Sequence, residues 1–365
     1  MSGARIARLA ACAVAGALLV AGCSSDDAGS SSNSAPVDTA ATSVVSTESA
    51  PCEGVSGALT VYSGRSEKLV SGVFSDFTAA TGVEVEARYG DSGELAGQII
   101  TEGSASPADV FFSQDAGALG ALESADLLAP LPDNVLERVS EGFRSSSGRW
   151  LGTSGRVRVI VYNPTLVASP PNTIDALLAP EWKNRIGFAP TNASWQSFVT
   201  ALRVLRGEAG ARTWLEGFAA NNPVPFEKNA AVRDAVNSGQ IALGLVNHYY
   251  LYELIAAEGA DAVVAKNQFL AAGDPGGLVN VAGVGVLASS DRSAAAECLA
   301  SYLVSDAGQR YFVDKTFEYP LVAGIQQAAG LPAFAELQPP SLNLSDLRSL
   351  AQTQELLADV GLLTE

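Results

Sequence analysis

The sequence predicts an α/β protein made of two lobes. From Ala58 onward, segments with the alternating pattern of strands take turns with segments that have the periodicity of amphipathic helices. A second series of the same kind follows from Trp150. Roughly 310 residues lie beyond the N-terminal segment, which is enough for two domains of ordinary size.

The first series alternates between strand and helix. We expect strands at residues 58–62, 83–88 and 109–112, and helices at residues 67–80, 93–101 and 116–125. This order predicts a parallel sheet covered by helices. In such open sheets, ligands bind beyond the carboxyl ends of the strands. The polar segments expected at these ends are 63–67, 90–92 and 113–115.

The second series predicts another α/β unit and the connections between the two. We expect extended segments at 150–155 and 156–162, strands at 185–189, 240–246 and 278–287, and helices at 197–205, 294–303, 306–314 and 347–360. The extended segments near residues 156 and 280 are the expected crossovers, which act as hinge strands. The predicted N-terminal lobe is therefore 54–155 plus 281–330, and the C-terminal lobe is 156–280 plus 331–365, with the ligand cleft between them.

Residues 1–22 have the pattern of an export signal. Arg5 and Arg8 precede an apolar stretch that ends directly before Cys23 and is too short to stay in a membrane as a spanning helix. The cysteine after Ala-Gly resembles the lipobox of bacterial lipoproteins, in which this cysteine carries the lipid. The alternative is an ordinary signal peptide with a chance cysteine. The resemblance implies a protein of the cell envelope that a lipid on Cys23 anchors to the outer face of the cytoplasmic membrane.

The segment after Cys23 is rich in Ser, Ala, Thr and Asp up to about residue 50, with almost no large apolar residue. Because such a composition cannot bury enough surface to offset the entropy of ordering, residues 23–53 are expected to form a flexible tether. No later stretch has the length and apolarity of a membrane-spanning helix.

The cysteines favour one disulfide. Cys12 leaves with the signal and Cys23 would carry lipid, which leaves Cys52 and Cys298. In an oxidising exterior such a pair is expected to form a disulfide. The sequence has no Cys-x-x-Cys motif and no histidine cluster, which argues against a zinc or redox centre.

The chain is strongly acidic, with a formal net charge of −17 that becomes more negative once the arginines of the signal are lost. This charge disfavours nucleic acid and anionic membrane surfaces as partners. It mildly favours cationic ligands through long-range attraction.

Tyr249 and Tyr250 follow the only histidine of the chain, in the run Asn247–His248–Tyr249–Tyr250. Phenolate is a hard anionic ligand that suits a highly charged cation, and such a cation removes the proton by lowering the phenol pKa. The run follows the predicted strand 240–246, so both tyrosines are expected at a carboxyl end, where neighbouring side chains need not point to opposite faces. The alternative is a pair within a strand, with one ring packed inward and the other on the surface.

Seven short blocks occur in order between Ala58 and Val322. They are TVYSGR at 60–65, ELAGQ at 94–98, SPADVF at 106–111, EWKNRIG at 181–187, NHYY at 247–250, DPG at 274–276 and EYP at 318–320. With these blocks the chain resembles the ferric-iron substrate-binding proteins of ABC transporters, which have the type II periplasmic binding protein fold. The resemblance implies that Tyr249 and Tyr250 bind Fe(III), bare or as a small chelate. It also implies a monomer without enzyme activity that delivers iron to an ABC permease and its ATPase.

Two of the usual ligands of that family are absent. Well-known members add a histidine after the first strand and a glutamate after the third, where this chain has Ser66 and Gln114. Another branch uses a third tyrosine in the loop 191–195, where this chain offers Ser194 and Trp195.

Further iron ligands are therefore expected, because Fe(III) takes about six hard donors. The candidates are Glu67, Asp115 and Gln114, together with water or a bound anion. Glu67 has an alternative role in the first turn of a helix, where an acid favours the macrodipole. Asp115 has an alternative role as a helix N-cap.

A carbonate or phosphate anion would need hydrogen-bond donors. Family members that hold an anion use the loop matching residues 192–194 and the positions matching Asn229 and Asn247. In this chain, Arg156 and Arg65 could add charge-assisted bonds. The predicted anion-binding residues are Asn192, Ala193, Ser194, Asn229, Asn247, Arg156 and Arg65. Either arginine has an alternative role as a structural salt-bridge partner. His248 is expected to pack against the site or support it.

Two other classes of function compete with this resemblance. A hydrolase is disfavoured because the sequence has no G-x-S-x-G elbow, no HExxH and no P-loop, while a glycosidase with two carboxylates stays open. Proteins of the same fold also carry polyamines, thiamine, phosphonates or sulfate. A polyamine site needs acids bracketed by aromatics, which this chain offers in Glu67, Asp115, Tyr249, Tyr250 and Trp195.

Overall fold

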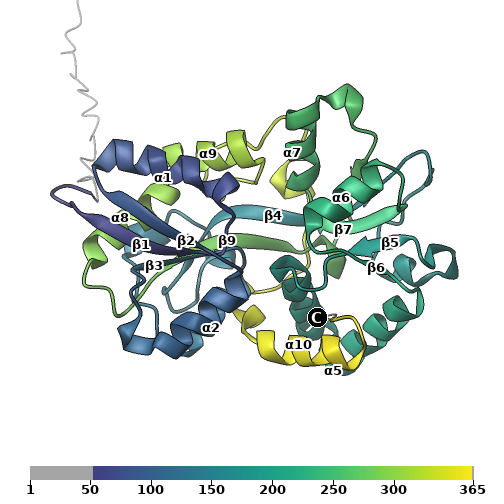
Figure 1. The fold of residues 1–365 in the computed structure, drawn as a ribbon, viewed down its shortest axis with the longest axis horizontal. Coiled ribbons are helices and arrows are strands. Elements are labelled where there is room, and N and C mark those ends of the chain that lie inside the picture. The colour runs from purple at the N-terminus through teal and green to yellow at the C-terminus, as the bar shows by residue number, and fades with distance from the viewer. Residues whose placement is uncertain (1–51, 364–365) are drawn as a thin grey trace, which may run out of the picture. The chain divides into compact units, whose positions relative to one another are not determined.

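A computed structural model describes residues 52–363, so the predicted signal peptide, Cys23 and nearly all of the predicted tether lie outside the described residues. The strands are β1 (Ala58–Ser63), β2 (Glu84–Tyr89), β3 (Val110–Ser113), β4 (Leu151–Tyr162), β5 (Ile186–Phe188), β6 (Val224–Pro225), β7 (Leu243–Asn247), β8 (Lys266–Gln268) and β9 (Val279–Val286). The α-helices are α1 (Glu67–Thr81), α2 (Ser92–Glu102), α3 (Ala116–Ser124), α4 (Asp133–Leu136), α5 (Ala193–Ala220), α6 (Asn229–Asn237), α7 (Tyr249–Glu258), α8 (Ser293–Leu303), α9 (Asp306–Thr316) and α10 (Leu350–Asp359). Figure 1 shows them in a ribbon drawing.

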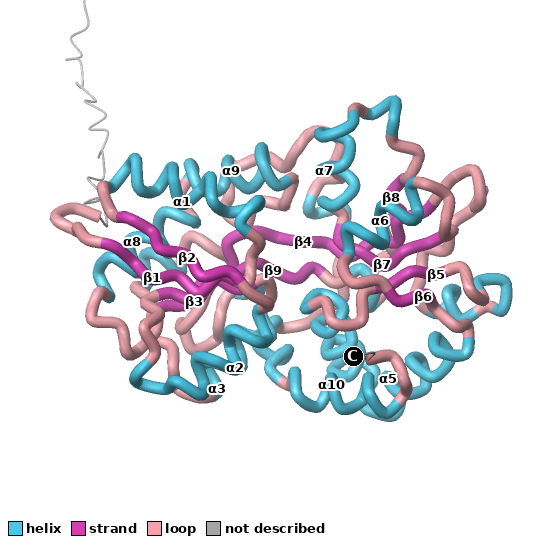
Figure 2. The backbone as a smooth tube through the Cα atoms, viewed as in Figure 1, coloured by secondary structure: helices cyan, strands magenta, loops and turns pink. Residues whose placement is uncertain are grey.

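The strands form one sheet in the order β2-β1-β3-β9-β4-β7-β5-β6, with β8 paired to β4. The pairs β1–β2 and β1–β3 are parallel, as their alternation with helices predicts. β9 is antiparallel to both β3 and β4. Figure 2 shows helices packed on either side of the strands.

β4 belongs to both halves of the sheet. It is one continuous strand where the sequence predicts two extended segments. Its N-terminal part pairs with β9 up to the register Val157↔Val279, and its C-terminal part pairs with β7 from Arg158↔Asn247. The change of partner lies next to the predicted lobe boundary at residue 156 and supports that boundary, which stays a prediction.

Each half of the sheet has its own hydrophobic core. Val61, Phe77 and Phe112 belong to the core on the β1–β3 side, while Trp214 and Phe218 belong to the core around α5. The C-terminal segment packs against both halves, because the 3₁₀ turn Leu344–Arg348 contacts α3 as well as α5. Among residues 52–363, no helix has the length and apolarity needed to cross a membrane.

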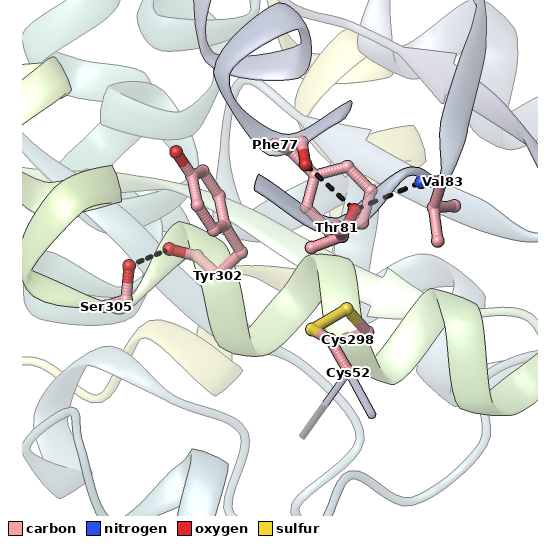
Figure 3. The surroundings of a disulfide bond; sticks show 7 residues. All are labelled: Cys52, Phe77, Thr81, Val83, Cys298, Tyr302 and Ser305. Carbon is pink, nitrogen blue, oxygen red and sulfur yellow. Dashed lines mark hydrogen bonds between the residues drawn. A yellow bond between two sulfur atoms is a disulfide. The ribbon is translucent and has the colours of Figure 1, made fainter. Parts of the chain in front are cut away.

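A disulfide joins Cys52 to Cys298 in α8, with a Cα–Cα distance of 5.2 Å across a sequence separation of 246. Figure 3 shows it beside Thr81 at the end of α1. The Thr81 hydroxyl donates to Phe77 O (2.8 Å) and accepts from the Val83 N–H (3.2 Å), which fixes the turn from α1 into β2. The disulfide thus holds the start of the described chain against the β1–β3 half, and a bond closing so long a loop typically adds about 2–4 kcal/mol to stability.

Candidate tyrosine and arginine site

The polar segments at the ends of β1, β2 and β3 meet as expected. The Gln114 N–H donates to Ser92 Oγ (2.9 Å). Gly64 lies so close to the same serine that a Cβ on it would be 1.9 Å from Ser92 Oγ, so only glycine fits there. The three loops therefore form one edge of the sheet, at the place where ligands bind in this fold class.

Tyr249 and Tyr250 occupy the first turn of α7, directly after β7. Their rings stack with centroids 4.3 Å apart and planes at 26°. Tyr249 is fully buried, whereas Tyr250 is half-buried. The Tyr249 hydroxyl has no hydrogen-bond partner among the described residues, which is unusual for a buried polar group and indicates a place for a ligand.

The surroundings of Tyr249 keep its phenol protonated unless a cation is bound. Burial and the neighbouring Tyr250 raise the pKa of Tyr249 well above its usual value. Arg65 and Arg156 oppose this rise because positive charge favours the phenolate. A metal cation would act in the same direction and more strongly.

A cluster of buried charges lies beside Tyr249. Arg65 Nη2 donates to Glu318 Oε2 at 2.7 Å, and Arg156 Nε lies 3.9 Å from Glu318 Oε1. All three side chains are fully buried. Nε and Nη1 of both arginines and Oε1 of Glu318 have no hydrogen-bond partner among the described residues. We call Arg65, Arg156 and Glu318 the buried charge cluster.

Arg158 adds a further positive charge two residues after Arg156 in β4. It is buried, its guanidinium lies 5.2 Å from the ring centre of Phe198, and burial lowers the pKa of Arg158 to about 9. Burial and neighbouring Arg65 also lower the pKa of Arg156. Glu318 pairs with Arg65 and Arg156, and Asp115 lies close enough to Arg156 to affect its pKa, whereas Arg158 has no carboxylate partner among the described residues, so three guanidiniums face two carboxylates. The site therefore carries unbalanced positive charge.

The predicted anion-binding loop is assembled at the N-terminus of α5, where Ala193 is the first helical residue. Asn192 Oδ1 accepts from the backbone N–H of Ser194 (3.0 Å), from Ser194 Oγ (2.8 Å) and from Asn229 Nδ2 (3.1 Å). Asn247 Nδ2 donates to Ser194 Oγ (3.1 Å). The sequence-predicted residues of this loop thus lie together, and Asn229 Oδ1 is buried without a partner among the described residues.

Asp115 takes the capping role that was its alternative. Its Oδ1 accepts from the N–H groups of Gly117 (2.8 Å) and Ala118 (3.2 Å) at the start of α3 and from Ser197 Oγ of α5 (3.1 Å). Its Oδ2 is buried and has no partner among the described residues. Burial raises the pKa of Asp115, against the effect of nearby Arg156.

Glu67 and Gln114 lie at the rim of this edge. Glu67 is exposed in the first turn of α1, which is its alternative role, and lines a groove of about 570 Å³ with Phe74 and Tyr89. Neither tyrosine of the pair lines that groove. Within residues 52–363, His, Cys, Asp and Glu side chains form no group of three that could hold a metal.

His248 is fully buried, and burial lowers its pKa to about 4. Its Nδ1 accepts from the Val157 N–H (3.1 Å), and its Nε2 lies 2.8 Å from Phe317 O. Both ring nitrogens are thus engaged by the backbone, so the side chain packs and supports the site.

Two members of the site, Arg158 and Glu318, are not among the residues that the sequence predicts for it. Arg158 follows Arg156 by two residues in an apolar strand. Because residues two apart in a strand lie on the same face, this spacing is the signal that predicts both arginines on one face of the sheet. In the sequence, Glu318 stands out only as part of the EYP block, because a partner 253 positions away leaves no local pattern.

Two α/β halves that share long strands, with a buried polar site where strand ends meet helix N-termini, define a solute-binding protein. The family model of bacterial extracellular solute-binding proteins matches residues 105–341, and the chain belongs to this family. It is a binding protein and not an enzyme. The family resemblance and the type II fold expected from the sequence are confirmed.

Known relatives are similar over most of the chain. The Fe(3+)-binding periplasmic protein of Serratia marcescens is 34% identical over 331 residues, which cover 90% of this chain and 97% of the relative. The structure of iron-bound HitA from Pseudomonas aeruginosa matches with a TM-score of 0.80 and 34% identity, covering 83% of this chain and 99% of that one. The Trichodesmium protein IdiA (FutA), in complex with iron and citrate, matches with a TM-score of 0.72 and 31% identity, covering 84% and 99%.

Proposed function

We propose that this protein captures Fe(III) through Tyr249 and Tyr250. The observation that carries the proposal is the stacked pair itself, with one phenol buried and without a hydrogen-bond partner among the described residues. Two phenolates are hard anionic donors that suit Fe(III). The names of the relatives from Serratia marcescens and Pseudomonas aeruginosa, which refer to iron, support the same ligand.

The charge of the site supports a second, anionic component. Two phenolates leave one positive charge on Fe(III), and three arginines against the carboxylates of Glu318 and Asp115 add one more. So much positive charge away from water is costly unless an anion compensates it. Unpartnered N–H groups of Arg65 and Arg156 are the proposed donors to carbonate or phosphate. The loop of Asn192 and Ser194 is the second proposed source of donors, and Ser194 would exchange its bonds to Asn192 Oδ1 for bonds to the anion.

The remaining iron ligands are proposed from the same edge of the sheet. Asp115 Oδ2 is the first candidate, because it is buried and has no hydrogen-bond partner among the described residues. Glu67 and Gln114 are the second candidates, as they lie at the rim, and water would complete the shell.

The same charges disfavour the cationic alternatives. A polyamine or thiamine would be repelled by the arginines beside the tyrosines and, unlike Fe(III), would not deprotonate the two phenols to offset this repulsion. A phosphonate or sulfate would suit them, so an anionic ligand without iron is the second candidate function.

The visible spectrum tests the iron proposal. Purified protein with Fe(III) should show a tyrosinate-to-iron charge-transfer band, and Tyr249→Phe with Tyr250→Phe should abolish it. Tyr252→Phe is the matched control, because this tyrosine lies in the same helix and its hydroxyl donates to Gly330 O (3.0 Å). A colourless protein that binds a phosphonate or sulfate in calorimetry would replace iron with the second candidate.

Delivery completes the proposed function. Ligand that bridges the two lobes favours their closed arrangement, and the closed form would dock on an ABC permease. The lipid on Cys23 would keep the monomeric protein at the outer face of the cytoplasmic membrane. Cys23→Ser should therefore move the protein from the membrane fraction to the soluble fraction.

A further inference from the structure

His248 binds both backbone groups of one residue in β4. The His248 N–H donates to Val157 O (2.8 Å), and the Val157 N–H donates to His248 Nδ1 (3.1 Å). Because Nδ1 accepts a hydrogen bond, the ring proton is on Nε2. The residue that precedes the tyrosine pair is therefore attached to β4 through both its backbone and its side chain.

Val157 is the residue at which β4 changes partner. The register with β9 ends at Val157↔Val279, and the register with β7 begins at Arg158↔Asn247. β4 is common to both halves of the sheet, so a rotation of one half against the other is absorbed by backbone angles near this point. The imidazole of His248 is hydrogen-bonded to the backbone at this residue.

The opposite side of the ring contacts the segment after α9. Nε2–H donates to Phe317 O (2.8 Å), and Phe317 ends α9 in the left-handed conformation (φ 57°). The ring centre lies 5.0 Å from that of Tyr319 and 5.9 Å from that of Tyr249, to which it is nearly perpendicular (86°). The fully buried imidazole thus contacts β4, the 317–319 segment and the ring of Tyr249, which meets it edge to face.

We propose that His248 is a positioning residue that couples rotation of the two halves of the sheet at Val157 to the placement of the Tyr249 phenol. Movement at Val157 displaces the imidazole, and the imidazole displaces the Tyr249 ring because both are buried in close contact. Measuring this coupling by the release of iron rests on the proposed function.

The test compares two substitutions of His248 with a control. His248→Ala removes both side-chain links, while His248→Asn retains an oxygen that can accept from the Val157 N–H. Asn221→Ala is the matched control, because Asn221 is buried in the other core and donates to Leu177 O (2.9 Å) and Ala179 O (3.1 Å). The rate at which a chelator removes iron is followed by the charge-transfer band, alongside thermal unfolding of each variant.

We expect His248→Ala to release iron at least about tenfold faster than the wild type, and His248→Asn to release it at an intermediate rate. Asn221→Ala should have a lower melting temperature than the wild type but should release iron at the wild-type rate. Equal release from His248→Ala and Asn221→Ala would overturn the coupling. If the wild type binds no iron, the proposed function fails. Hydrogen exchange of the iron-free protein then tests the coupling between Val157 and the tyrosine pair. His248→Ala should then speed exchange in the first turn of α7 as well as at Val157, and faster exchange at Val157 alone would refute the proposal.

Discussion

The carboxylate of Glu318 lies 2.7 Å from Nη2 of Arg65, and both side chains are fully buried. The same oxygen accepts from Thr316 Oγ1 (2.8 Å) and Ser154 Oγ (3.2 Å). Its second oxygen faces Arg156 at 3.9 Å. One carboxylate thus pairs with two guanidiniums next to the tyrosine pair.

Glu318→Gln should destabilise the protein strongly. The substitution removes the carboxylate that pairs with two buried guanidiniums, and breaking a buried pair in this way costs about 3–5 kcal/mol. Urea unfolding of the iron-free protein measures the loss. The exposed Glu336→Gln is the control, and adding Arg65→Met to Glu318→Gln should recover much of the stability. A loss below about 1 kcal/mol would show that the arginines are compensated in another way.

Tyr249→Phe should have opposite effects on stability and on ligand binding. The hydroxyl is buried and has no partner among the described residues, so its removal relieves a desolvation penalty of about 1–3 kcal/mol. We expect the free energy of unfolding of the iron-free variant to rise while the charge-transfer band is lost or greatly weakened. The matched control is Tyr319→Phe, whose hydroxyl donates to Pro332 O (3.0 Å) and whose loss should destabilise. A destabilised Tyr249→Phe would mean that the phenol has a partner, such as an ordered water.

The secondary structure was largely predictable because it depends on local pattern. The strand expected at residues 240–246 is β7, and its end delivers the tyrosine pair to the edge of the sheet. The helix expected at residues 197–205 begins earlier, because the side chain of Asn192 caps its N-terminus by accepting from the Ser194 N–H. Its end is close to the prediction, because Gly207 (φ 70°) interrupts the helix, and a second helical stretch follows to Ala220. A side-chain cap is a weak signal in a sequence.

The charges of the site were harder to predict, because they depend on pairing across the fold. Whether Arg65 serves as a donor to a ligand or as a salt-bridge partner depends on Glu318, which is 253 positions away. Asp115 likewise joins α3 to Ser197 of α5. The residue types at the site could be found from the sequence, whereas the geometry that assigns each of them a partner could not.

Acid should weaken the iron-free protein through its only histidine. The pKa of His248 is lowered by burial from 6.5 to about 4, while the unfolded chain takes up a proton near the ordinary value. The unfolded state therefore binds more protons between these pH values, so the free energy of unfolding falls as the pH falls. The loss should reach about 3 kcal/mol near pH 4. Urea unfolding at several pH values measures it, and His248→Asn should lack this part of the slope. An unchanged slope in that variant would assign the acid sensitivity to carboxylates.

Arg156→Met should change how iron binding depends on anions. In the wild type the excess positive charge is costly in the loaded site, so iron should bind more tightly when carbonate or phosphate is added. Removing one buried guanidinium lowers that excess and removes a donor with unpartnered N–H groups. We therefore expect the anion to strengthen iron binding by a smaller factor in Arg156→Met than in the wild type. Competition with a chelator, with and without added anion, measures both factors. Arg212→Met is the control, because Arg212 forms a surface ion pair with Asp359 (2.9 Å). The same anion effect in all three proteins would place the anion away from Arg156.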